Sequence, residues 1–368
     1  MDQYIFVGGM DYEFSGVDFR IFCDNRLKRI QAANTAKKDL KFQIFDVRRG
    51  EVVVNETTYP KGVKTEKVTK TKPFDALSRA NFNAAATPSG GTHYTFKERQ
   101  DKAMSILDIY DAVQKVGTGD PGTLRELSIF SHAWMGGPIL VNSYDDRTGH
   151  FDVPMPMGLP PVTMPYTVAG TARDPDDKDP RAQYDFIPPT MDAAALANFQ
   201  KAFHPDGIIW IWGCGFPRLV HEILHKIEHN SVYKKAGLGD AVEFTFTNLS
   251  NDHIDLLEKV LKPLIGAFPD RKKVVVKFKF LKYFFCMVTT SSYSHQLARN
   301  SKVKVFGAVM GTYAEYDTTG PLPLMSIFNG FGAHFDFYEN YLGFKYDAEG
   351  RHYGAYEPGF SCAKPSVP

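Results

Sequence analysis

The chain has 368 residues, of which 43% are hydrophobic and 23% charged, and this composition supplies enough apolar side chain for a large buried core. Lys and Arg total 43 against 42 for Asp and Glu, a net charge of +1. No overall electrostatic field therefore draws the protein to nucleic acid or to an anionic membrane surface, and we expect it to bind neither.

The N-terminal stretch MDQYIFVGGMDYEF lacks the basic region and long apolar run of a secretory signal. The longest apolar stretch, 274–290, is interrupted by lysines and is shorter than the roughly 20 residues that a membrane-spanning helix needs. Four scattered cysteines without a CxxC pair are expected to stay reduced. These features predict a soluble, cytoplasmic protein with no signal peptide, and signal-independent export is the alternative. The cysteines are Cys23, Cys214, Cys286 and Cys362.

The first elements alternate between strand and helix. YIFVGG (4–9) is a short apolar run closed by glycines, which predicts a buried strand. Helical spacing follows over 16–33, and KFQIFDV (41–47) predicts a second strand. Residues 48–95 are polar and rich in Lys, Thr and Gly, and we interpret them as a hairpin or a long surface excursion.

The middle of the chain continues this alternation. An amphipathic pattern predicts a helix over 96–117, and the apolar run at 124–130 predicts the next strand. Residues 145–190 are rich in Pro and Asp, which is typical of an insertion rather than of a helix that connects two strands. A helix near 191–203 and a strand at 208–212 follow.

The last third contains four further elements and two segments without a clear pattern. The elements are a helix at 217–230, a strand at 241–247, a helix from 251 to 268 and a strand at 302–311. Residues 274–298 fit either a strand or a helix. Residues 318–368 are aromatic and turn-rich, and we expect an irregular C-terminal segment there.

Apolar strands that alternate with helices predict a mostly parallel sheet with helices on both faces. The expected fold is a three-layer α/β fold with long insertions, in a single domain over 1–368. Ligands of such folds gather beyond the carboxyl ends of the strands. The residues at these predicted ends are Gly8, Gly9, Asp46, His132, Cys214 and Gly311.

His132 and Cys214 are a candidate catalytic pair. A nucleophilic cysteine needs a base within hydrogen-bond reach and surroundings that favour the thiolate. Cys214 comes just before the helix that starts near Pro217, and we expect that N-terminus to lower the pKa of the thiol and to offer N–H groups to an oxyanion. If the strands before His132 and Cys214 are neighbours, their ends lie about 5 Å apart.

The stretches LSIFSHA and IIWIWGC resemble the caspase and gingipain type of cysteine peptidase, in which one strand ends in His-Gly and a later strand ends in the cysteine. Ala133 stands where that family has glycine, and the Gln-Ala-Cys of caspases is replaced by Trp-Gly-Cys. The resemblance implies a caspase-like sheet, with a flavodoxin-like one as the alternative. It also implies that His132 is the base, that Cys214 is the nucleophile and that a peptide bond is cleaved.

Several residues near this pair are candidates for lining the cleft or for holding an oxyanion. They are Trp134, Gly136, Gly137, Gly215 and Asp46. The stretches SYSHQLA (292–298) and GTYAEYD (311–317) are two further sources of polar groups for the same cleft.

HEILH is a second, competing pattern. His221 and His225 lie at i and i+4, on one helical face, and Glu222 follows the first histidine. This spacing resembles the zincin core, in which two histidines bind Zn²⁺ and the glutamate activates a water. Zincins have an uncharged residue where Lys226 stands, and no third ligand occurs in a recognisable motif.

Three functions therefore remain open. The first is a cysteine hydrolase that acts on a peptide or protein substrate and needs no cofactor. The second is a zinc peptidase that uses HEILH. The third is a non-catalytic α/β protein that acts as a binding module or effector. Neither a GxGxxG nor a GxxxxGK[ST] nucleotide fingerprint occurs in the chain.

Overall fold

The computed structural model describes residues 1–11, 17–86, 92–96, 102–140, 148–153, 162–167, 185–186, 188, 191–316 and 320–367. Most of the predicted insertion at 145–190 lies outside these residues.

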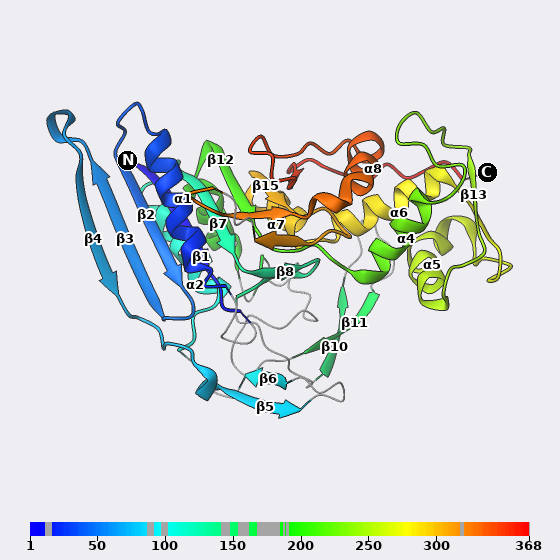
Figure 1. The fold of residues 1–368 in the computed structure, drawn as a ribbon, viewed down its shortest axis with the longest axis horizontal. Coiled ribbons are helices and arrows are strands. Elements are labelled where there is room, and N and C mark those ends of the chain that lie inside the picture. Colours follow the sequence, from blue (N-terminus) through cyan, green and yellow to red (C-terminus); the bar gives the residue numbers. More distant parts are fainter. Residues whose placement is uncertain are drawn as a thin grey trace.

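An eight-stranded central sheet in the order β18-β15-β12-β7-β1-β2-β3-β4 organises the molecule (Figure 1). Its inner strands β15, β12, β7, β1 and β2 are parallel, and β3, β4 and β18 are antiparallel additions at the two edges. The strands are β1 (Asp2–Gly8), β2 (Leu40–Asp46), β3 (Glu51–Thr58), β4 (Thr65–Thr71), β7 (Leu124–Phe130), β12 (Phe203–Ile211), β15 (Lys304–Gly307) and β18 (Gly354–Tyr356). The predicted mostly parallel α/β sheet is confirmed.

Eight α-helices and three short 3-10 helices occur in the described residues. The α-helices are α1 (Arg20–Ala33), α2 (Ile106–Gly119), α3 (Ala193–Ala202), α4 (Arg218–Glu228), α5 (Asn251–Ile265), α6 (Phe278–Thr290), α7 (Tyr293–Ser301) and α8 (Gly332–Leu342). The 3-10 helices are η1 (Pro60–Gly62), η2 (Arg79–Asn81) and η4 (Asn329–Phe331).

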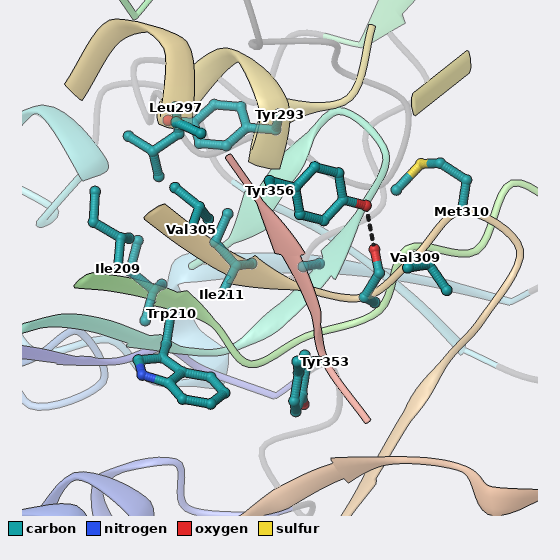
Figure 2. Packing of buried hydrophobic residues seen from close by; sticks show 14 of the residues in the cluster. Ile209, Trp210, Ile211, Tyr293, Leu297, Val305, Val309, Met310, Tyr353 and Tyr356 are labelled. Carbon is teal, nitrogen blue, oxygen red and sulfur yellow. Dashed lines mark hydrogen bonds between the residues drawn. The ribbon is translucent and has the colours of Figure 1, made fainter. Parts of the chain in front are cut away.

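Helices cover both faces of the sheet, as the uniformly apolar strands predict. Figure 2 shows Leu297 of α7 on the same side of β12 as Ile209 and Ile211, and Trp210 on the opposite side with Tyr353. All five of these side chains are buried. The side of Trp210 is also the side of α1, since the Arg26 guanidinium lies 5.7 Å from the centre of the Trp210 ring.

A buried ion pair fastens α1 to the sheet. Arg26 of α1 binds both carboxylate oxygens of Glu126 in β7, at 2.8 and 2.7 Å, and its third nitrogen lies 2.6 Å from Glu349. The side chains of Arg26 and Glu126 are only 8% and 4% exposed. Because an unpaired charge at this depth is costly, the pair holds α1 in one position on the sheet.

The smaller strands form five two-stranded sheets. These are β5 (Phe82–Ala86) with β6 (Thr92–Phe96), β8 (His132–Trp134) with β9 (Gly137–Ile139), β10 (Thr148–Val153) with β11 (Val162–Thr167), β13 (Glu243–Phe246) with β14 (Val274–Lys277), and β16 (Ala314–Tyr316) with β17 (Met325–Ile327). The strand predicted at 241–247 is therefore real but lies outside the central sheet, because its partner is β14.

Residues 48–95 contain β3 and β4, which form the hairpin that was one of the two predictions for this segment and which extend the central sheet at its edge. Two other predicted segments differ in the structure. The helix predicted over 96–117 begins only at Ile106, because Ser105 and Asp108 form a capping box there. The C-terminal segment 318–368, expected to be irregular, contains α8.

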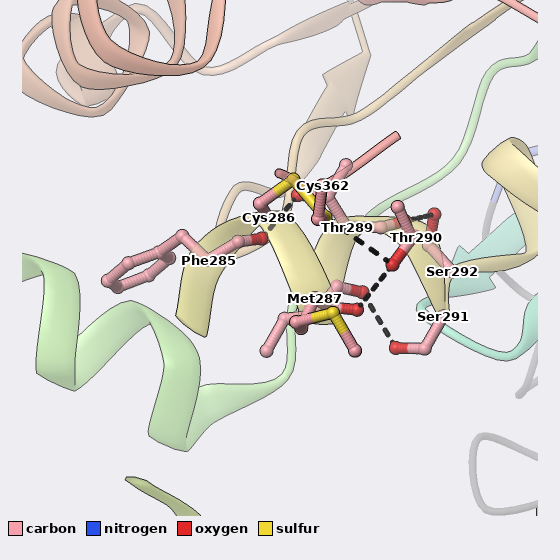
Figure 3. Close-up of a disulfide and its surroundings, with 9 residues drawn as sticks. Phe285, Cys286, Met287, Thr289, Thr290, Ser291, Ser292 and Cys362 are labelled. Carbon is pink, nitrogen blue, oxygen red and sulfur yellow. Dashed lines mark hydrogen bonds between the residues drawn. A yellow bond between two sulfur atoms is a disulfide. The ribbon is translucent and has the colours of Figure 1, made fainter. Parts of the chain in front are cut away.

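The ambiguous stretch 274–298 divides into a strand and two helices. β14 leads directly into α6, and a run of hydroxyl residues ends that helix (Figure 3). The Thr289 hydroxyl donates to the carbonyl of Phe285 at 2.7 Å, and the Ser292 hydroxyl donates to that of Thr289 at 2.7 Å. Ser292 also accepts from the backbone N–H of His295 and so caps α7.

Cys286 and Cys362 form a disulfide, with the sulfurs 2.10 Å apart (Figure 3). The prediction that the cysteines are all reduced is therefore wrong for this pair. The bridge ties the C-terminal segment to α6, across a sequence separation of 76 residues. No local sequence pattern indicates this pairing, because only the path of the folded chain brings the two cysteines together.

None of the described helices is long and apolar enough to cross a membrane.

Candidate functional site

β7 and β12 are neighbouring parallel strands, so their carboxyl ends lie at the same edge of the sheet. Ile129 is paired with Ile211, and the backbone N–H of Trp212 donates to the carbonyl of Ile129 at 3.0 Å, one residue beyond the last strand pair. His132 follows β7 by two residues, and Cys214 follows β12 by three. The predicted adjacency of the two strands is confirmed.

Side chains on these two strands alternate between the two faces of the sheet. The Trp212 indole N–H donates to the Ser128 hydroxyl at 3.1 Å, and the rings of Phe130 and Trp212 stack 5.0 Å apart, so these three side chains share the α1 face. His132 comes two residues after Phe130, and its ring lies edge-on to Phe19, just before α1, at 5.5 Å. His132 therefore also lies on the α1 face.

Gly213 keeps the ends of β7 and β12 in contact beyond the last paired residues of the two strands. A Cβ at this position would lie 2.4 Å from the Cβ of Ala133 and 2.7 Å from the carbonyl oxygen of Ser131. Only glycine allows so close an approach. Cys214 thus follows a residue that packs directly on the segment carrying His132.

Asp11, in the segment that follows β1, contacts His132. One oxygen of its carboxylate lies 2.8 Å from Nε2 of His132, and the other accepts from the backbone N–H of Val17 at 3.1 Å. Asp11 follows β1, and the Met10 N–H donates to the carbonyl of Leu140, at the end of β9. The sequence interpretation missed Asp11, although its position two residues after the predicted strand at 4–9 was a usable signal.

Cys214 is half-buried, and its sulfur accepts a hydrogen bond from the backbone N–H of Ala314 at 3.3 Å. Burial raises the pKa of the thiol, and the Ala314 N–H opposes this only in part. The expectation that a helix N-terminus lowers this pKa is wrong, since desolvation dominates. The helix begins only at Arg218, after Pro217, which contributes no capping side chain.

The 311–317 stretch contributes to this site through Ala314 and also through Tyr316. The ring of Tyr316 lies 6.0 Å from that of Phe19 and stacks on Phe22 at 5.8 Å, which places it on the α1 face. Burial raises the pKa of Tyr316, and its electrostatic interactions with Asp11 and Cys214 raise it further. Asp11, Cys214 and Tyr316 therefore share one electrostatic neighbourhood.

The glycines expected near the pair have structural roles. Gly136 lies in the turn between β8 and β9, and Gly137 is the first residue of β9; Gly137 has a φ of 137°, and a Cβ there would lie 2.8 Å from the Tyr293 ring. The Trp134 indole lies over Gly136. The N–H of Gly215 already donates to the carbonyl of Thr312 at 2.9 Å, so Gly215 does not offer this group to an oxyanion as expected.

Asp46 was expected to line the cleft, but its side chain is buried and bound to arginines. Its carboxylate accepts from Nη1 of Arg49 at 2.8 Å and lies 3.9 Å from Nη1 of Arg20. It ends β2, which β1 separates from β7. Its role is to hold the loop after β2.

The HEILH helix is α4, and its residues point to different partners. Glu222 accepts from Nε of Arg218 and lies against Nε2 of His253 in α5, both at 2.7 Å. His221 Nδ1 instead lies 2.9 Å from Nε2 of His334 in α8. His225 is exposed, and its ring stacks on His229. The structure thus places Glu222 with α5 and His221 with α8. Within the described ranges, no three His, Cys, Asp or Glu side chains already form a metal-binding group.

Comparison of the chain with protein-family models finds no match. Comparisons with curated proteins and with solved structures find no match either. The geometry of the site and the sequence motifs around His132 and Cys214 therefore carry the functional inference.

Proposed function

We propose that the protein is a cysteine hydrolase that cleaves a peptide or amide bond, with Cys214 as nucleophile and His132 as base. The observation that carries this proposal is the pairing of β7 with β12, since it brings both residues to one edge of the sheet while Asp11 holds the imidazole at 2.8 Å. The resemblance of LSIFSHA and IIWIWGC to caspase-type peptidases is part of the same proposal and is the reason for choosing a peptide substrate.

The protonation states follow from the surroundings of each group. Burial raises the pKa of the Cys214 thiol, so the sulfur carries its proton near neutral pH and needs a base to become a nucleophile. The Asp11 carboxylate accepts the proton on Nε2 of His132, which leaves the lone pair on Nδ1 to take the thiol proton. Asp11 thereby orients the imidazole and stabilises it once it is charged.

The reaction then proceeds in two steps. The thiol proton moves to Nδ1 of His132 as the sulfur–carbon bond forms at the substrate carbonyl, and the imidazolium returns that proton to the leaving amine as the carbon–nitrogen bond breaks. Water, deprotonated by the same imidazole, hydrolyses the thioester, and its proton returns to the sulfur. No external oxidant or cofactor enters this balance.

The location that we propose differs from the cytoplasmic one expected from the sequence. The Cys286–Cys362 disulfide favours an oxidising compartment, because cytosolic thiols are generally kept reduced.

Selective thiol alkylation tests the proposed pair. All four cysteines are described: two are bridged and Cys23 is buried, so Cys214 is the free thiol with accessible surface. We expect iodoacetamide to label Cys214 at pH 7 at least tenfold faster in the wild type than in H132A. A fluorogenic peptide pool should be cleaved by the wild type and not by C214A. Equal labelling in H132A, or cleavage retained in C214A, would refute the proposal.

A further inference from the structure

A row of three titratable side chains, two of them buried and one half-buried, joins α4 to α8, apart from the proposed catalytic pair. His334 of α8 lies between two residues of α4: its Nε2 is 2.9 Å from Nδ1 of His221, and its Nδ1 is 2.7 Å from a carboxylate oxygen of Glu228. The side chains of His334 and Glu228 are 3% and 5% exposed. The reaction proposed for Cys214 uses none of the three.

The order Glu228, His334, His221 in this row determines which kind of ligand the two histidines can bind. Glu228 favours the proton on Nδ1 of His334, which leaves the Nε2 lone pair directed at His221. A carboxylate behind the far nitrogen of a histidine is the usual outer partner of a metal-binding imidazole, because it fixes the tautomer and the ring orientation.

We propose that His221 and His334 are two ligands of a site for a transition-metal dication such as Zn²⁺, with Glu228 as the outer partner of His334 and His225 as the third ligand. Two nitrogens that bind one tetrahedral zinc at 2.0–2.1 Å lie about 3.3 Å apart. The two that now share a hydrogen bond lie 2.9 Å apart. The ion therefore replaces the proton on Nδ1 of His221, which is released to solvent, once the pair opens by about 0.4 Å and both rings turn toward the metal.

His225 is placed to complete the site after a change of side-chain rotamer. It lies one helical turn after His221, and their ring centres are 6.0 Å apart. Its ring now stacks on that of His229 at 4.0 Å, but both residues are exposed, so nothing buried has to move when the ring turns. Water supplies the remaining position of a tetrahedral ion.

This ligand set differs from the one that HEILH predicts by analogy with zincins. Glu222, which would activate the metal-bound water in a zincin, is held by His253 and Arg218 instead. The proposed ion therefore has no water-activating glutamate beside it. Its effect is to fasten α4, the helix that follows Cys214, to α8 of the C-terminal segment.

Metal titration of the chelator-stripped full chain tests the proposal, with Zn²⁺ in calorimetry and Co²⁺ in visible absorption. We expect one site per chain, a rise in Tm on loading, and cobalt bands of tetrahedral intensity. H221A and H334Q should abolish binding at this site, H225A should weaken it by more than tenfold, and E228Q should weaken it by about 10- to 100-fold, as is usual for outer partners. E222Q is the matched control and should bind as the wild type does.

Three results would overturn the proposal: no saturable binding to the wild type, unchanged binding in H334Q, or a loss of binding in E222Q equal to that in H221A. His221 is only half-buried, so H221A keeps the test decisive if the buried His334 does not tolerate substitution. Calorimetry and cobalt absorption do not depend on Cys214, so failure of the hydrolase proposal leaves this result interpretable.

Discussion

The carboxylate of Asp11 lies 2.8 Å from Nε2 of His132, although 121 residues separate the two along the chain. The contact joins the loop after the first strand of the sheet to the end of β7. It also distinguishes the two ring nitrogens of His132, and the role that we propose for His132 as the base for Cys214 depends on this distinction.

Replacement of Asp11 by Asn should slow reaction at Cys214 while leaving the fold intact. The amide presents no negative charge to the imidazole and favours neither tautomer strongly, so we expect alkylation of Cys214 and peptide cleavage to fall by about 10²- to 10⁴-fold. The pH at half-maximal rate should also shift, which a purely structural role would not cause. D11E should recover part of the rate. D24N, on the exposed side of α1, is the control and should behave as the wild type.

The titration of Cys214 predicts a loss of stability at alkaline pH. Its pKa in the folded protein is raised above the ordinary value of 9.0, so the folded state holds the proton more tightly than the unfolded state does. The resulting stabilisation is fully present below pH 9 and is lost as the pH rises through the raised pKa. Urea unfolding between pH 8 and 11 should show a steeper loss for the wild type than for C214A. Parallel curves would contradict the burial of the thiol.

Addition of a methyl group at Gly213 should disturb the site directly. The new Cβ would lie 2.4 Å from that of Ala133, so the two strand ends must separate. We expect G213A to lose about 1–3 kcal/mol of unfolding free energy and to react more slowly at Cys214. G119A provides the comparison, because a Cβ there meets nothing within 4 Å. A stable, fully reactive G213A would show that this contact does not set the geometry.

Reduction of the Cys286–Cys362 bridge should lower the free energy of unfolding by about 2–5 kcal/mol, because the bridge restricts a long loop of the unfolded chain. The measurement is urea unfolding with and without dithiothreitol, with the C286A/C362A double variant as reference. Mass spectrometry of the alkylated, unreduced protein after unfolding should show two modified cysteines. Four modified cysteines would mean that the bridge is absent.

The Arg26–Glu126 pair allows a test of how α1 is held. Removal of one partner leaves a buried charge, so R26M and E126Q should each cost about 3–5 kcal/mol of unfolding free energy. The double variant R26M/E126L should cost much less than the two single losses together, because no charge remains buried. Purely additive losses would show that the two side chains do not interact.

The apolar runs along the chain were sufficient to predict the centre of the fold. The strand expected at 124–130 is β7, that at 41–47 overlaps β2, and that at 208–212 overlaps β12. Burial on both faces imposes this pattern on each strand locally, so it can be recognised without knowledge of the neighbours. The strands at the sheet edges were harder to predict, because β4 is exposed along its whole length and its sequence has no apolar run.

The sequence by itself determined that His132 and Cys214 follow two buried strands, because strand ends are local features of hydrophobicity and turn residues. Only the tertiary structure decided which polar groups meet: Asp11 with His132, Glu222 with His253, and His221 with His334. Only the tertiary structure decided the disulfide and the protonation of the Cys214 thiol as well. Such contacts depend on where distant segments of the chain come together and on how much water they exclude, and no local pattern encodes either quantity.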